Sequence, residues 1–91
     1  MKATKEELIN FLEKEVLAPT ESNQNATEIV KKKVRATRIR LNQLKSAEKV
    51  RVYFWSAMAT DRGIDSYNKI KDAGGRTFED VRKEFKTLCG D

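Results

Sequence analysis

The sequence predicts an all-α protein, a compact bundle of four or five helices in a single domain over residues 1–91. Apolar residues recur at spacings of three and four along several segments, as on the buried face of a helix. Residues typical of helix N-caps precede these segments. The run 50–55 is the only β-prone stretch, but its flanks favour helix and it has no hairpin partner.

The first predicted helix follows a capping box, in which Thr4 is the N-cap and Glu7 lies three residues later. Pro19 is predicted to end this helix, because proline cannot donate a backbone hydrogen bond. A polar loop is expected at about 18–25. Three residues of this stretch are candidate caps for the next helix: Ser22, Asn23 and Asn25.

The second predicted helix, from Ile29 to Lys45, organises the rest of the chain. Its apolar stripe consists of Val30, Val34, Thr37, Leu41 and Leu44. Ser46 follows, either as the N-cap of a third helix or as a brief interruption of the second.

The segment 47–73 has two interpretations. One long helix passes through Gly63, at a cost of about 1 kcal/mol relative to alanine, or two helices break near 61–63. Gly74 and Gly75 close the segment, and Thr77 with Asp80 caps the last helix. The apolar stripe of that helix is Phe78, Val81, Phe85 and Leu88.

Charge is distributed unevenly along the chain. The net charge is +5, but residues 1–30 carry −3, residues 31–51 carry +8 and residues 52–91 carry zero. A local excess of this kind favours a polyanionic partner more than an evenly basic surface does. The alternative is that the acidic first helix covers part of the basic segment.

Several basic side chains fall in one row on the second helix, along one flank of its apolar stripe. Together with their neighbours they form the candidate DNA- or RNA-binding set: Lys31, Lys32, Arg35, Arg38, Lys45 and Arg51. Lys33 and Arg40 lie on the other flank of the stripe. If the first helix packs antiparallel to the second, Glu13 or Glu15 is expected to reach Lys33 or its neighbours. Arg35, Arg38 and Lys45 are then expected to stay open to solvent.

Some apolar residues lie away from the predicted stripes. Ile39 is predicted to pack on a second surface of the second helix. The alternative is that Ile39 is an exposed apolar contact among the basic side chains of this helix. Trp55 is predicted to pack at the edge of the core, with stacking on a base or a protein partner as the alternative. The candidate partner-contact set is Ile39, Trp55 and Arg62. A surplus of such groups, with Ile29 and Val52 among them, favours a second function class, a protein-interaction module or a homodimer.

The composition argues against catalysis and against metal or cofactor binding. The chain has no histidine, so the usual acid–base group near neutral pH and His-activated nucleophiles are missing. One cysteine, Cys89, excludes an internal disulfide and a multi-thiolate metal site. The charged start is unlike a signal peptide, and no apolar run approaches the roughly 20 residues of a membrane span. We therefore expect a non-enzymatic binding protein of the cytoplasm, without metal, cofactor or membrane.

Overall fold

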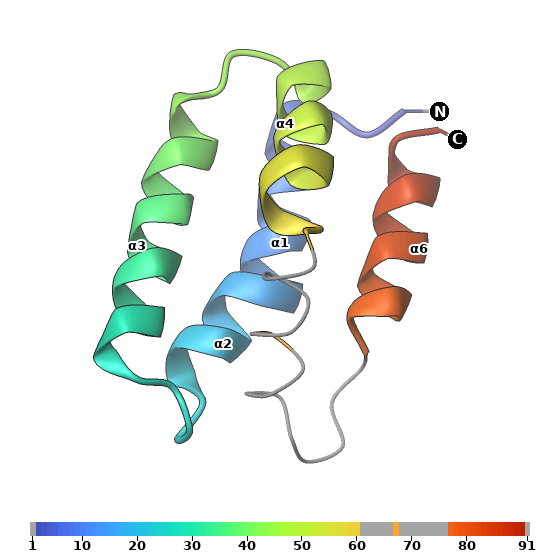
Figure 1. The fold of residues 1–91 in the computed structure, drawn as a ribbon. Helices are drawn as coiled ribbons and strands as arrows, with labels where there is room; N and C mark the ends of the chain where they lie inside the picture. Colours follow the sequence, from blue (N-terminus) through green and yellow to red (C-terminus); the bar gives the residue numbers. More distant parts are fainter. Residues whose placement is uncertain (1, 61–66, 68–76, 91) are drawn as a thin grey trace.

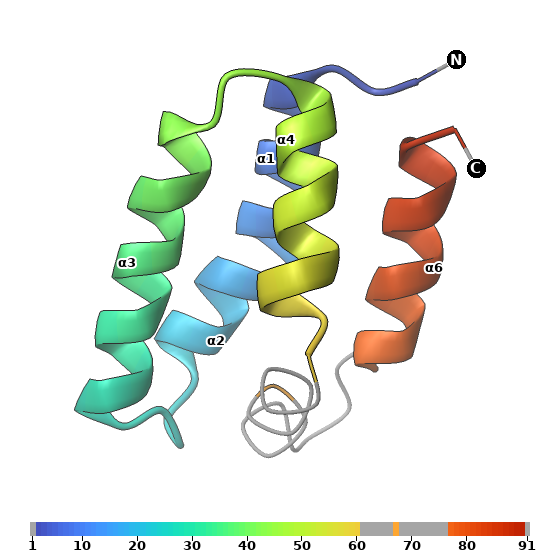
Figure 2. The same ribbon diagram turned by 45° about the horizontal axis from the view of Figure 1, so that its top comes forward.

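The computed structural model describes residues 2–60, Tyr67 and residues 77–90. This part of the chain contains helices and no strands, which confirms the all-α prediction. The elements are α1 (Lys5–Leu12), the π-helical turn η1 (Glu13–Leu17), α2 (Ala18–Ser22), α3 (Glu28–Gln43), α4 (Ala47–Tyr53), the π-helical turn η2 (Phe54–Met58) and α6 (Phe78–Leu88). Helices α3 and α6 lie at opposite edges of the bundle, with α1 and α4 between them (Figures 1 and 2).

The first helix is longer than predicted. Its capping box is confirmed, since the Thr4 hydroxyl accepts from the backbone N–H of Glu7 and the Glu7 carboxylate accepts from the backbone N–H of Thr4. The prediction that Pro19 ends the helix is wrong, because α1, η1 and α2 follow one another without a break as far as Ser22. The loop to α3 is therefore confined to 23–26, where a loop over 18–25 was expected.

A π-helical turn and a tyrosine explain why this helix tolerates proline. In a regular helix, residue 19 would donate its N–H to the carbonyl of Glu15, but Pro19 has no N–H. The hydroxyl of Tyr67, far along the chain, donates to that carbonyl at 3.3 Å. The turn η1, immediately before α2, widens the helix by one residue where the proline ring would otherwise crowd the preceding turn.

Helix α3 begins one residue before the predicted start and ends two residues before the predicted end, so Leu44 and Lys45 lie beyond it, and its cap also differs. Thr27, and not one of the three predicted residues, caps it: its hydroxyl accepts from the backbone N–H of Val30 at 3.2 Å. The predicted apolar stripe is confirmed, since Val34 and Leu41 are buried and the other members are half-buried.

The next helix begins at the expected place and ends early. Ser46 is an N-cap, with its hydroxyl accepting from the backbone N–H of Lys49. The helix continues through η2 and ends at Met58, so the interpretation of one helix through Gly63 is wrong. The predicted break at 61–63, and the glycines at 74 and 75, lie outside the residues that the structure describes.

The core is centred on Phe54, whose side chain has no solvent exposure. Its ring stacks on Phe85 of α6 at a centroid distance of 4.1 Å and lies edge-on to Trp55 at 5.0 Å. The capping box of Thr77 and Asp80 at the start of α6 is confirmed. Trp55 is half-buried and packs against the core, as predicted. Other buried residues come from the first helix, α4 and α6: Leu8, Leu12, Val16, Leu17, Val50, Phe78 and Val81.

Candidate binding surface on helix α3

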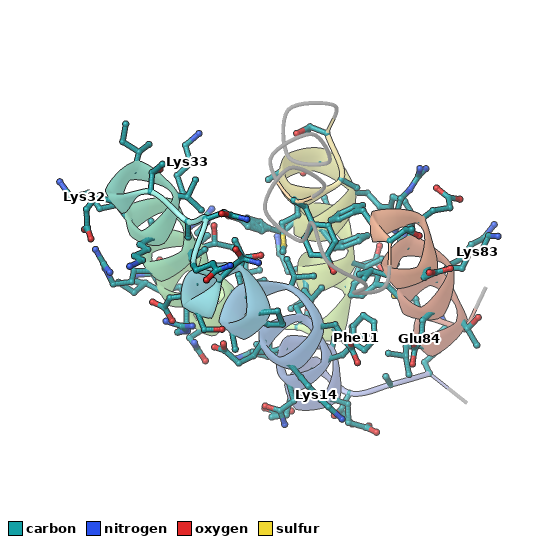
Figure 3. All side chains as sticks on the ribbon, turned by 90° about the horizontal axis from the view of Figure 1, so that it is seen from below. Phe11, Lys14, Lys32, Lys33, Lys83 and Glu84 are labelled. Atoms are coloured by element: carbon teal, nitrogen blue, oxygen red, sulfur yellow. The ribbon has the colours of Figure 1, made fainter. Side chains whose placement is uncertain are left out.

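Helix α3 occupies an edge of the bundle, and this position decides which of its side chains reach solvent. One flank packs against η1 and α2, while the face opposite the apolar stripe points away from the molecule (Figure 3). Ile39 lies on this outward face and is 61% exposed. The prediction that Ile39 packs on a second surface is therefore wrong, because α3 is not sandwiched between two other helices.

Arg38 is held by two carboxylates from the first helix. Its Nε and Nη2 donate to the two oxygens of Glu13 at 2.5 and 2.9 Å, and Nη2 also donates to Oε1 of Glu21 at 2.9 Å. A fourth carboxylate contact, from Nη1 to Oε2 of Glu21, measures 3.4 Å. The expectation that Arg38 stays open to solvent is therefore wrong, although its side chain keeps 32% exposure.

The charges in this network shift one another in the expected directions. The hydrogen bonds from Arg38 lower the pKa of the Glu21 carboxyl below its ordinary value of 4.5, and the positive charges of Arg35 and Lys31 add smaller contributions. Hydrogen bonds to Glu13 and then to Glu21 raise the pKa of Arg38. Both shifts favour the charged forms of Glu21 and Arg38.

The register between the two helices follows from the extra turns around Pro19. Glu13 was expected to lie near Lys33, but the first helix continues to Ser22 and so carries Glu21, not Glu13, towards the start of α3. Glu13 instead lies beside Arg38, near the middle of α3. The first helix therefore pairs directly with Arg38 and places Glu21 near Lys31 and Arg35, while Lys45 lies beyond the end of α3.

The remaining predicted nucleic-acid contacts divide into two groups. Lys32, Arg35 and Lys45 are exposed, and they make no ion pair with the residues that the structure describes; Lys31 is half-buried near Glu21. Arg51 lies on α4 and forms an ion pair with Glu48 of the same helix. Lys31, Lys32 and Arg35 therefore lie together on α3, while Lys45 lies just beyond its last residue and Arg51 lies apart on α4.

The predicted partner-contact set is not one surface. Trp55 packs against the core. The guanidinium carbon of Arg82 lies 5.6 Å from the centroid of the Trp55 ring, a cation–π contact within the molecule. Ile39 lies on the outward face of α3. Arg62 lies outside the described residues.

Sequence reasoning missed a set of residues on the opposite flank of α3. Two hollows lie there, between α3 and the helix formed by α4 and η2, and Lys33, Arg40 and Lys49 are among the residues that line them. The spacing of Lys33 and Arg40, seven residues apart, places them on one side of the helix and was a usable signal. Lys49 gave no such signal, because only the packing of α4 beside α3 brings it to the same surface.

In residues 2–60, at Tyr67 and in residues 77–90, there is no group of three or more acidic or cysteine side chains that could hold a metal ion. No helix in the same part of the chain is both long and apolar enough to cross a membrane. Comparison with protein-family models, curated proteins and solved structures finds no match to this chain.

Proposed function

We propose that the protein binds the phosphate backbone of nucleic acid through the outward face of α3, without catalysing a reaction. The supporting observation is that Lys32 and Arg35, exposed on this helix, and Lys45, exposed just beyond its last residue, are free of ion pairs within the described part of the chain. Glu28, in the first turn, is the single carboxylate of α3, so only Glu13 and Glu21 of the first helix offset its other charges, chiefly that of Arg38.

The spacing of these groups suits a phosphate backbone. Lys32 and Arg35 are about one turn apart on α3, and Lys45 follows two residues after the helix ends at Gln43. Lys31 adds a fourth positive charge beside Arg35. Contacts of this kind neutralise phosphates and set orientation, but they do not read bases, so we propose binding without strong sequence preference.

Arg38 has a structural part in this proposal. Since its guanidinium is saturated by Glu13 and Glu21, it fixes α3 against the first helix rather than contacting a phosphate. The surface then presents four cations, and binding to a duplex is expected to weaken with salt at a slope of about −3 to −4 in log–log form.

The test is a salt series of duplex DNA and duplex RNA binding, measured by fluorescence anisotropy. The variant Lys32→Glu with Arg35→Glu is expected to lose binding, while circular dichroism shows that helicity is retained. A matched control, Lys83→Glu with Lys86→Glu, changes the net charge equally on the exposed face of α6, remote from α3 (Figure 3). This control is expected to keep most of the affinity and most of the salt slope.

Two results would overturn the proposal. One is the absence of binding at low salt, where contacts between these four cations and phosphates would be strongest. The other is an equal loss of affinity in the α3 variant and the α6 control, which would assign the binding to net charge and not to this face.

A further inference from the structure

A groove runs along the flank of α3 that faces away from Arg38. Its first half is a hollow of about 240 Å³ between the start of α3 and the end of η2, and its second half is a hollow of about 540 Å³ between the end of α3 and the start of α4. The two helices run antiparallel (Figure 1), and Ala57 lines both hollows. The hollows are therefore neighbouring parts of one groove.

The floor and the edges of the groove are apolar. Val16 and Leu17 of η1, both buried, line the first hollow from below, together with Val34 of α3. Two large apolar side chains stand at the edges with high exposure, Ile29 at 70% beside the first hollow and Val52 at 52% beside the second. Scattered exposed apolar residues are common on proteins, but here they flank one continuous apolar channel.

The rim of the groove is positively charged. Lys33 lines the first hollow, while Arg40 and Lys49 line the second. All three side chains are exposed, and Figure 3 shows Lys33 pointing outward beside the space between α3 and α4. Glu48 also lines the second hollow, but its carboxylate is occupied by an ion pair with Arg51. An occupant would therefore meet an apolar floor between cations.

We propose that this groove binds an amphipathic helix of a partner protein, with carboxylates beside its apolar stripe. From Ile29 to Leu44 the groove measures roughly 22 Å along α3, which matches about 15 residues of helix. A helix satisfies its own backbone hydrogen bonds and so loses none against an apolar floor. Lys33 and Arg40, seven residues apart, face carboxylates with the same spacing on one side of the occupant, and Lys49 faces its other side.

The charge of the rim selects this occupant over two others. Helix α3 of a second copy would bring Lys and Arg side chains against Lys33 and Arg40, and this repulsion opposes a symmetric dimer through the groove. A nucleic-acid backbone would meet the cations but would leave the apolar floor uncovered. An acidic amphipathic helix complements both features.

The probe for the test is a fluorescent peptide of about 16 residues with leucine at the helical spacing of three and four and glutamate on both flanks. Its matched control peptide carries glutamine at every glutamate position. We expect the native chain to bind the glutamate peptide at least about tenfold more tightly than the glutamine peptide. Backbone amide NMR shifts on titration are expected to map to Val30, Thr37, Ala57 and Val52.

Two charge-matched variants separate this groove from the nucleic-acid surface. Arg40→Glu with Lys49→Glu is expected to weaken the glutamate peptide by about tenfold or more and to leave most duplex binding in place. Lys32→Glu with Arg35→Glu is expected to do the reverse. Ile29→Ser with Val52→Ser tests the apolar contribution and is expected to weaken both peptides.

The inference is overturned if the glutamate peptide does not bind, or if it binds no better than the glutamine peptide. It also fails if the groove variant keeps full affinity, or if the NMR shifts map to the outward face of α3. Because the duplex assay uses the same variants, failure of the groove is distinguishable from failure of nucleic-acid binding.

Discussion

The guanidinium of Arg38 joins two helices through one side chain. Its paired N–H groups lie in a plane and match both oxygens of Glu13, while the remaining edge reaches Glu21 two turns later. A lysine at this position would offer one point charge and could not hold both carboxylates with the same geometry. The side chains are about one-third exposed, so solvent screens each pair and the value of the network lies chiefly in fixing the register of α3.

The Arg38 network makes stability sensitive to acid. Because Arg38 lowers the pKa of Glu21, this carboxylate stabilises the fold above its ordinary pKa of 4.5 and loses that contribution as the pH falls through its lowered value. In Arg38→Gln the Glu21 pKa returns towards 4.5. We therefore expect this variant to lose less stability than the wild type as the pH falls from about 5 to about 3, the range in which carboxyl groups titrate. Thermal unfolding followed by circular dichroism at each pH measures the difference.

Arg40→Gln is the matched control for that measurement. It removes the same charge from the same helix, but its side chain lies on the opposite flank and is not among the causes of the Glu21 shift. Its unfolding temperature is expected to follow the wild-type dependence on pH. Parallel curves for Arg38→Gln and the wild type would show that the network does not couple Glu21 to folding. Glu7 and Glu48, whose pKa values are lowered by Thr4 and Arg51, keep part of the acid sensitivity in every variant.

At the scale of elements, the first helix depends on a substitute for one missing backbone hydrogen bond. Pro19 leaves the Glu15 carbonyl without the donor of a regular helix, and the Tyr67 hydroxyl takes that place from a distant part of the chain. Tyr67 is buried, and its ring lies edge-on to Phe78 at 5.3 Å, so the tyrosine also joins the first helix to the core beneath α6.

A double-mutant cycle tests this substitution. Tyr67→Phe alone is expected to destabilise the fold by about 0.5–1.5 kcal/mol, because the hydrogen bond from its hydroxyl to the Glu15 carbonyl is lost. In a Pro19→Ala background the new N–H supplies a donor, so the same change is expected to cost less, with a coupling of about 0.5–1 kcal/mol. Urea unfolding of the four proteins gives the coupling. Additive effects would show that Tyr67 and Pro19 act independently.

Sequence reasoning succeeded where the signal is local. Thr4, Ser46 and Thr77 cap their helices because a side-chain oxygen and an N–H three residues later suffice to form the cap. The apolar stripes were predictable for a similar reason, since a period of three and four residues fixes which face of a helix is buried.

Sequence reasoning failed where distant residues decide the outcome. Pro19 predicts a helix end from the local sequence, because the hydrogen bond from Tyr67 to the Glu15 carbonyl joins residues far apart in the chain. The sequence predicts that Arg38 is a free cation, because nothing near it in the chain shows that the first helix brings Glu13 and Glu21 beside it. The exposure of Ile39 depends on α3 lying at an edge of the bundle, and no pattern within α3 carries that information.

At the scale of the whole molecule, α3 divides the basic charge between two surfaces. Lys32, Arg35 and Lys45 lie outward or towards the first helix, while Lys33 and Arg40 border the groove beside α4. Arg38 belongs to neither surface, because Glu13 and Glu21 of the first helix bind its guanidinium. The segment 31–51, with a net charge of +8, can thus present cations for phosphates on one side of α3 and a charged rim for an acidic helix on the other.

The same charge predicts how the protein behaves towards copies of itself. Ile29, Ile39 and Val52 are exposed and would favour self-association, but each lies on or beside the basic helix, so a symmetric contact through them brings like charges together. At about 0.01 M salt the screening length is roughly 30 Å, and it falls to about 3 Å near 1 M. We therefore expect a monomer at low salt, with any dimer growing stronger as salt rises. Sedimentation equilibrium across a wide range of protein and salt concentrations measures this. A dimer that weakens as salt rises would contradict the prediction, because it would show the acidic first helix of one copy bound to α3 of another.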